Sequence, residues 1–191
     1  ATAVAATSTI TGTGTKKLNV GTNTIDVKCK SASGSTRTYK LTVVRKEAAK
    51  PTGTLSSTKY TVGDKYITGI TPGTKASNFL AGLSVDGGTA KLVGANGKQN
   101  QGLAATGNKV EVYVDNKKKT SYEVVIYGDV NGDGEINVLD MIKVNRHILG
   151  LDKLSGVYLV AADANRKGDG LNVLDMIYIN RHALGLSTIK Q

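Results

Sequence analysis

Residues 137–150 read Asn-Val-Leu-Asp-Met-Ile-Lys-Val-Asn-Arg-His-Ile-Leu-Gly, and residues 172–185 read Asn-Val-Leu-Asp-Met-Ile-Tyr-Ile-Asn-Arg-His-Ala-Leu-Gly. The two stretches agree at 11 of 14 positions at an offset of 35 residues, which indicates an internal duplication. Apolar residues recur in both at spacings of three and four, the period of an amphipathic helix. Residues 128–191 are therefore predicted to form an all-α unit with two equivalent helices.

The stretch before the first helix has the spacing of a twelve-residue calcium loop. It reads Asp-Val-Asn-Gly-Asp-Gly-Glu-Ile-Asn-Val-Leu-Asp over residues 129–140. Ca²⁺ takes about six to eight oxygen ligands, which EF-type loops supply from positions 1, 3, 5, 7, 9 and 12, with a glycine at the sharp turn of position 6. The alternative is a solvated turn rich in Asp and Asn, but the spacing and the duplication favour calcium. The predicted ligands are Asp129, Asn131, Asp133, the Glu135 carbonyl, Asn137 and Asp140.

The second loop departs from this pattern. It runs for thirteen residues, 163–175, with two residues added before Asp169 and one lost after Gly170. Arg166 and Lys167 also bring positive charge near the expected ion, so we expect weaker calcium binding here than in the first loop. The carbonyl ligand cannot be assigned from this spacing. The predicted side-chain ligands are Asp163, Asn165, Asp169, Asn172 and Asp175. Ile136 of the first loop is expected to pair with its twin, Leu171.

An ordinary EF-hand has a helix before its loop, whereas residues 121–127 have the pattern of a strand. Each unit is therefore a loop followed by one helix. In this respect, and in the motif Gly-Asp-Val-Asn-Gly-Asp-Gly-Glu-Ile-Asn-Val-Leu-Asp, residues 128–191 resemble the type I dockerins. The resemblance implies two loop–helix (F-hand) repeats that hold two Ca²⁺ ions and are joined by a short linker helix. It also implies a cohesin module as partner, carried by a scaffoldin, a surface protein or an enzyme.

Each predicted helix carries two apolar stripes. Met141, Val144 and Ile148, with Met176, Ile179 and Ala183 in the second copy, are predicted to form the internal core. The other stripe includes an Arg and is suited to an interface with a partner, unless both stripes pack internally or against the β-domain. Many type I dockerins have a hydroxylated pair where this chain has Val-Leu, which predicts a divergent cohesin specificity. The predicted partner-binding residues are Val138, Leu139, Ile142, Asn145, Arg146 and Leu149, with Val173, Leu174, Ile177, Asn180, Arg181 and Leu184.

The remainder of the chain is predicted to be all-β. Residues 1–46 have strand patterns at 18–20, 24–28 and 38–44, and they resemble the C-terminal half of cadherin-like or Ig-like sandwiches of bacterial surface proteins. The front strands of such a sandwich are missing, so this segment is a truncation or a smaller complete unit. Residues 47–52, with Pro51, are predicted to be a linker. Residues 53–127 are predicted to form a second β-sandwich, with a helical turn at 75–81, and resemble the X modules that accompany dockerins.

The charge distribution argues against nucleic acid as a partner. The net charge is +10, with 18 basic and 7 acidic residues in 1–127 but 7 basic and 8 acidic in 128–191. The lysines are spread along predicted strands, which is typical of solvated faces or edge protection, and no nucleic-acid-binding motif accompanies them. No apolar run approaches the ~18 residues of a membrane helix, so membrane insertion is not expected. The single cysteine, Cys29, excludes a disulfide within the chain and a cysteine-based zinc site.

No catalytic group stands out. His147 and His182 are copies at one repeat position, without a Ser or Cys nucleophile or a carboxylate dyad, and are interpreted as exposed helix residues. The sequence predicts a non-catalytic region of a secreted or cell-surface bacterial protein. It would tether the protein through a cohesin into a cellulosome-like complex that degrades polysaccharides, or into a cell-surface complex. The alternative is a structural stalk that calcium stiffens, with no cohesin partner.

Overall fold

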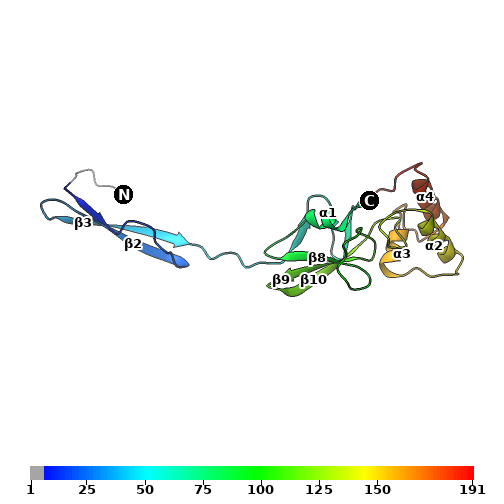
Figure 1. The fold of residues 1–191 in the computed structure, drawn as a ribbon, viewed down its shortest axis with the longest axis horizontal. Coiled ribbons are helices and arrows are strands. Elements are labelled where there is room, and N and C mark those ends of the chain that lie inside the picture. Colours follow the sequence, from blue (N-terminus) through cyan, green and yellow to red (C-terminus); the bar gives the residue numbers. More distant parts are fainter. Residues whose placement is uncertain (1–6) are drawn as a thin grey trace. The chain divides into compact units, whose positions relative to one another are not determined.

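The computed structural model describes residues 7–191, and the chain divides into two compact units, Ala1–Lys50 and Pro51–Gln191 (Figure 1). The first unit contains the strands β1, β2 and β3, which are blue to cyan in Figure 1, and the second runs from turquoise to red. The second unit therefore includes both the predicted β-sandwich and the predicted helical region. Within the described residues, every helix is too short or too polar to cross a membrane.

The first unit is a single antiparallel sheet in the order β1-β2-β3, built from β1 (Thr9–Thr11), β2 (Gly21–Lys30) and β3 (Thr36–Arg45). The prediction of a strand at 18–20 was wrong, and β2 begins at Gly21, three residues before the predicted strand at 24–28. Asn23 explains the difference, because its side chain accepts a hydrogen bond from the Asn19 amide at 2.8 Å and donates one to the Asn19 carbonyl at 2.7 Å. These bonds close the loop before the strand.

One face of this sheet is apolar and has no second layer over it. Ile25 lies opposite Leu41, and Val27 lies opposite Tyr39. Leu41 and Tyr39 are about half exposed, and no apolar side chain among the described residues of this unit is buried. The unit is therefore one sheet with an uncovered apolar face. Its likeness to half of a cadherin-like sandwich stays a prediction.

The β part of the second unit has two sheets. The strands are β4 (Leu55–Ser57), β5 (Thr61–Val62), β6 (Tyr66–Thr68), β7 (Leu83–Val85), β8 (Thr89–Val93), β9 (Lys109–Val114) and β10 (Lys117–Val124), with the helix α1 (Ala76–Ala81) between β6 and β7. Five strands form a sheet in the order β5-β6-β10-β9-β8, in which β6 and β10 are parallel, and β4 pairs with β7. A buried cluster that includes Phe79 of α1, Ile67 and Val112 unites these elements. The β-rich architecture fits a sandwich, while its identity as an X module stays a prediction.

The strand predicted from the pattern at 121–127 lies earlier in the chain, at Lys117–Val124. Asp115 and Asn116 have φ angles of 50° and 60°, and Val114 pairs with Lys117 across them. Two positive φ values in a two-residue loop are typical of a type I′ hairpin turn, which starts β10 at Lys117. The basic run Lys117-Lys118-Lys119 therefore belongs to β10, in the part of that strand that pairs with β9, whereas β6 pairs with β10 only at Glu123 and Val124.

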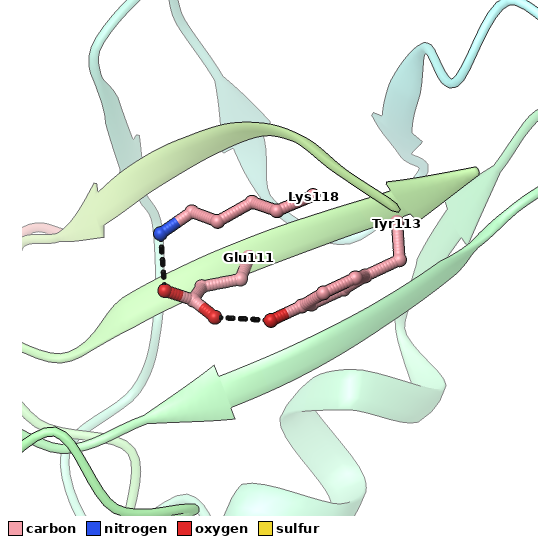
Figure 2. A network of polar contacts seen from close by, with 3 residues as sticks. All are labelled: Glu111, Tyr113 and Lys118. Carbon is pink, nitrogen blue, oxygen red and sulfur yellow. Dashed lines mark hydrogen bonds and ion pairs between the residues drawn. The ribbon is translucent and has the colours of Figure 1, made fainter. Parts of the chain in front are cut away.

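The exposed face of this hairpin carries a small polar network (Figure 2). Tyr113 donates a hydrogen bond to Glu111 at 2.7 Å, and Lys118 forms an ion pair with the other oxygen of the same carboxylate. The Lys118 ammonium, followed by the Tyr113 hydroxyl, lowers the pKa of Glu111. The charge of Lys118 is thus partly neutralised by Glu111. The absence of a nucleic-acid site stays a prediction.

The helical part of the second unit has three helices, α2 (Val138–Ile148), α3 (Gly156–Ala162) and α4 (Val173–Ala183). A capping box starts α2: the Asn137 side chain accepts from the Leu139 amide at 2.8 Å, and Asp140 accepts from the Asn137 amide at 2.9 Å. The same arrangement, with Asn172 and Asp175, starts α4. Such a box satisfies amides that would otherwise lack partners at a helix start.

The helices α2 and α4 pack on each other around Val144 and Ile179, as the sequence predicts. Ile136 and Leu171 belong to the same apolar cluster. The prediction for Ile148 and Ala183 was wrong, because both are exposed. The chain turns back after each helix, and the cluster includes Leu154 and the buried Ile189 instead. These two residues are also repeat equivalents, 35 positions apart.

Candidate calcium loops and docking surface

The first loop is built around a buried carboxylate. Asp129 is fully buried, and its Oδ1 accepts a hydrogen bond from the Gly132 amide at 2.8 Å. Its Oδ2 accepts from the Gly134 amide at 3.2 Å and from the Thr106 amide of the β-sandwich at 2.8 Å. Burial raises the pKa of Asp129 to about 6, and the neighbouring Asp140 adds to this. The loop therefore holds a negative charge away from water, a situation that a bound cation relieves.

Asp140 closes the first loop. Its Oδ1 accepts from the Val130 and Asn131 amides at 2.8 and 2.9 Å, and its Oδ2 accepts from Asn137, as described above. Asp133 and Asn131 bond to each other, and the Asp133 carboxylate also accepts from the Glu135 amide. The structure thus surrounds the carboxylates of Asp129, Asp133 and Asp140 with amide donors. Among the described residues, the acidic group whose oxygens all lie within 4.8 Å of one another is that of the second loop. Carboxylate oxygens are the donor type that Ca²⁺ prefers.

The second loop brings three carboxylates together in spite of its extra residue. Asp163, Asp169 and Asp175 present oxygens that all lie within 4.8 Å of one another. Asn165 lies beside them: its Oδ1 accepts from the Lys167 amide at 2.8 Å, and its amide donates to Asp175. The guanidinium of Arg166 stacks over the Tyr127 ring, with its carbon 4.7 Å from the ring centre. Asn172 caps α4 through its Oδ1, and its side-chain amide donates a hydrogen bond to Asp169 of the triad at 3.3 Å. These oxygen donors fit a hard divalent cation.

The predicted partner-binding residues are all exposed, and they lie on α2 and α4 or directly after them. Leu139 and Leu174 expose 55% and 45% of their surface, and Leu149 and Leu184 expose 61% and 64%. None of the twelve belongs to a buried cluster of the described residues. The alternative that both stripes pack internally or against the β-sandwich does not describe this structure. An exposed apolar surface of this kind is typical of an interaction site.

The two histidines are not the exposed residues that the sequence predicted. Both are half-buried, and His147 Nδ1 accepts a hydrogen bond from the Leu154 amide at 2.8 Å. His182 Nδ1 accepts from the Ile189 amide at 3.1 Å, and burial lowers the pKa of His182. Each histidine therefore fixes the chain where it turns back to place Leu154 or Ile189 against the core. Their identical position in the repeat was the signal for this structural role.

A second feature was missed in the sequence. The side chain of Gln191 bonds to the backbone of Tyr127, accepting from its amide at 2.7 Å and donating to its carbonyl at 2.9 Å. Ile189 is packed so close to Gly128 that a Cβ there would lie 2.8 Å from its Cδ1. The two ends of the helical region are thus held together. The 64-residue separation of these groups left no local pattern to reveal the contact.

The two loops are expected to differ in calcium affinity. Asp133→Ala should weaken calcium binding more than Asp169→Ala, because the first loop has regular ligand spacing and no basic residue within it. Isothermal titration calorimetry on the two variants, with the unmodified protein as control, measures this difference. Equal losses would show that the converged carboxylates of the second loop form an equally good cage.

Comparison with known proteins supplies one match. Neither the curated proteins nor the solved structures include a match to this chain. The family model of the dockerin type I domain matches residues 127–185, slightly under a third of the chain. This span contains both loops and the three helices α2, α3 and α4. Residues 127–185 are therefore a dockerin type I domain, as the resemblance of the motif in the first loop implied.

Proposed function

We propose that residues 128–191 bind two calcium ions, one in each loop, and dock onto a cohesin module through α2 and α4. The observation that carries this proposal is the duplicated set of exposed apolar, Asn and Arg side chains on these two helices. The match to the dockerin type I domain supports calcium-dependent binding to a cohesin in general. The number of ions and the residues of the docking surface are our proposals.

We further propose that the dockerin tethers a secreted or cell-surface bacterial protein into a larger assembly, either cellulosome-like or surface-bound. The β-sandwich of residues 53–127 would then serve as an X-module-like companion to the dockerin. The chain would be non-catalytic. The half-buried His147 and His182 of the dockerin already use Nδ1 to accept hydrogen bonds from the backbone. A calcium-stiffened stalk without a partner is the competing function, but it gives no role to the exposed stripes.

A pull-down experiment distinguishes cohesin docking from the function of a calcium-stiffened stalk. The full chain should retain one cohesin-bearing protein from the producer's secretome in calcium and release it in EDTA. The matched control is Tyr39→Ala, which removes an exposed apolar side chain outside the dockerin and should leave retention unchanged. Purified cohesin from the recovered protein should then bind in calorimetry. Failure to retain any cohesin-bearing protein in calcium would favour the stalk.

A further inference from the structure

We propose that the turn at residues 103–108 of the β-sandwich helps to form the first calcium site. In this proposal, Thr106 is a positioning residue that orients the ligand Asp129. This inference rests on the proposed calcium binding by residues 129–140. It adds a claim about affinity: the first loop reaches its full affinity only when the β-sandwich is docked on it. The helical region and the β-sandwich would thus share one metal site.

The hydrogen bonds to Asp129 show what the turn contributes. A carboxylate has about four lone-pair positions, two on each oxygen. Oδ2 accepts from both Thr106 and Gly134, so its two positions are filled. Among the described residues, Oδ1 accepts from Gly132 alone, which leaves one position open. The Thr106 amide therefore completes the set of donors that orients the carboxylate, with a single oxygen position left for a cation.

The repeat provides an internal comparison, because Asp163 has no donor equivalent to Thr106. Its Oδ1 accepts from the Lys167 amide at 3.2 Å, and its Oδ2 accepts from the Gly168 amide at 3.0 Å. Both donors come from the loop itself. The described hydrogen bonds to Asp163 include none from the β-sandwich, so the orientation of this carboxylate depends on its own loop alone.

The turn is held firmly enough to act as a support. Thr106 is buried, and its hydroxyl donates to the Ile126 carbonyl at 3.2 Å and accepts from the Ile126 amide at 3.1 Å. Asn108 accepts from the Ala105 amide at 3.2 Å and from the Asn100 side chain at 2.5 Å. The position of the Thr106 amide is therefore set by the core of the β-sandwich, not by the calcium loop.

Close packing confirms that the turn and the first loop touch along their length. The Gly73 amide donates to the Gly134 carbonyl at 2.8 Å. A Cβ on Gly134 would lie 2.6 Å from the Ala104 carbonyl oxygen, and one on Gly132 would lie 2.9 Å from that of Thr106. In the second loop, a Cβ on Gly168 or Gly170 would meet nothing within 4 Å. The turn at residues 103–108 thus covers the first loop, whereas the second loop meets the β-sandwich through the stacking of Arg166 on Tyr127.

Such contacts link calcium binding by the first loop to the docking of the β-sandwich on that loop. If the docked β-sandwich raises the affinity of the first loop, calcium in that loop must stabilise the docked arrangement by the same factor. Partners that orient a metal ligand typically contribute about 10- to 100-fold in metal affinity. The second loop should show no such linkage.

The test is a calcium titration of the full chain followed by NMR, reading the amides of Gly132 and Gly134 for the first loop and those of Gly168 and Gly170 for the second. Thr106→Val removes the hydroxyl that anchors the turn and should lower the affinity of the first loop about tenfold, leaving the second unchanged. Thr106→Ser keeps the hydroxyl and should restore the affinity. Unchanged affinity at the first loop, or equal losses at both, would overturn the proposal.

Two further measurements keep the test decisive if Thr106→Val does not fold. In the unmodified protein, the Thr106 amide should exchange with solvent more slowly in calcium than in EDTA; equal rates would overturn the proposal.

Gly134→Ala and Gly170→Ala form a matched pair, since the φ angles of the two glycines are 88° and 84° but only the first substitution adds an atom against the turn. Gly134→Ala should cost more affinity at its own loop. Absence of any calcium response at Gly132 and Gly134 in the unmodified protein would instead refute calcium binding by this loop.

Discussion

Removal of calcium with EDTA should abolish most of the helical circular dichroism of the chain while the β signal of residues 53–127 remains. Asp129, Asp140 and Asp175 are fully buried, and their charges have no cation to balance them once calcium is removed. Both helices start at capping boxes whose aspartates also belong to the loops, so loss of loop order removes the helix starts. The β-sandwich keeps its own core around Phe79.

The loss of helical signal in EDTA should depend on pH in a defined direction. Burial raises the pKa of Asp129 from 3.8 to about 6. A shift of this size means that the charged form of Asp129 lowers the free energy of unfolding by about 3 kcal/mol. This cost is fully present above pH ~6 and disappears as the pH falls below ~4. In EDTA, the helices should therefore be less stable at pH 7.5 than at pH 4.5. Calcium added back at pH 7.5 is the control and should restore the signal; helices that survive EDTA unchanged would contradict the calcium assignment.

Disabling both docking helices should remove most of the cohesin affinity, while disabling either one should weaken it little. The positions assigned to docking include Leu139 and Arg146 on α2, with identical twins Leu174 and Arg181 on α4. The backbone turns after the two helices are also equivalent, down to the paired hydrogen bonds of His147 and His182. The two helices therefore present nearly the same surface, and a cohesin could engage either one with the dockerin rotated by about half a turn.

The experiment compares three variants by calorimetry in calcium: Leu139→Ala with Arg146→Ala, Leu174→Ala with Arg181→Ala, and all four changes together. Hot-spot side chains of this kind each cost about 1–2 kcal/mol or more when truncated, so the combined variant should lose affinity by orders of magnitude. A large loss from one helix alone would contradict two equivalent modes. It would point to an orientation fixed where the copies differ, at Lys143 against Tyr178, or at Asp152, which pairs with Arg146 at 4.0 Å, against Ser187.

The dockerin could be predicted from sequence because its determinants are local. Ligand spacing, glycine at the sharp turn, the Asn–Asp capping boxes and the helical period each lie within about a dozen residues. The duplication repeated every signal at an offset of 35. The strands were predicted less well, because β pairing joins residues distant in the chain. The turn at Asp115 and Asn116, for instance, shifted β10 by several residues relative to its apolar pattern.

Only the tertiary structure decided how the parts support one another. The amide of Thr106 lies 23 residues from Asp129, and the Gln191 side chain lies 64 residues from Tyr127. His147 looks like a polar surface residue until the chain is seen turning back to place Leu154 against it. Sequence by itself therefore predicted which residues would hold calcium and which would meet a partner, since those predictions depend on side-chain type and spacing. Burial and the distant backbone amides decided how each calcium loop is supported, since they depend on packing that no local pattern encodes.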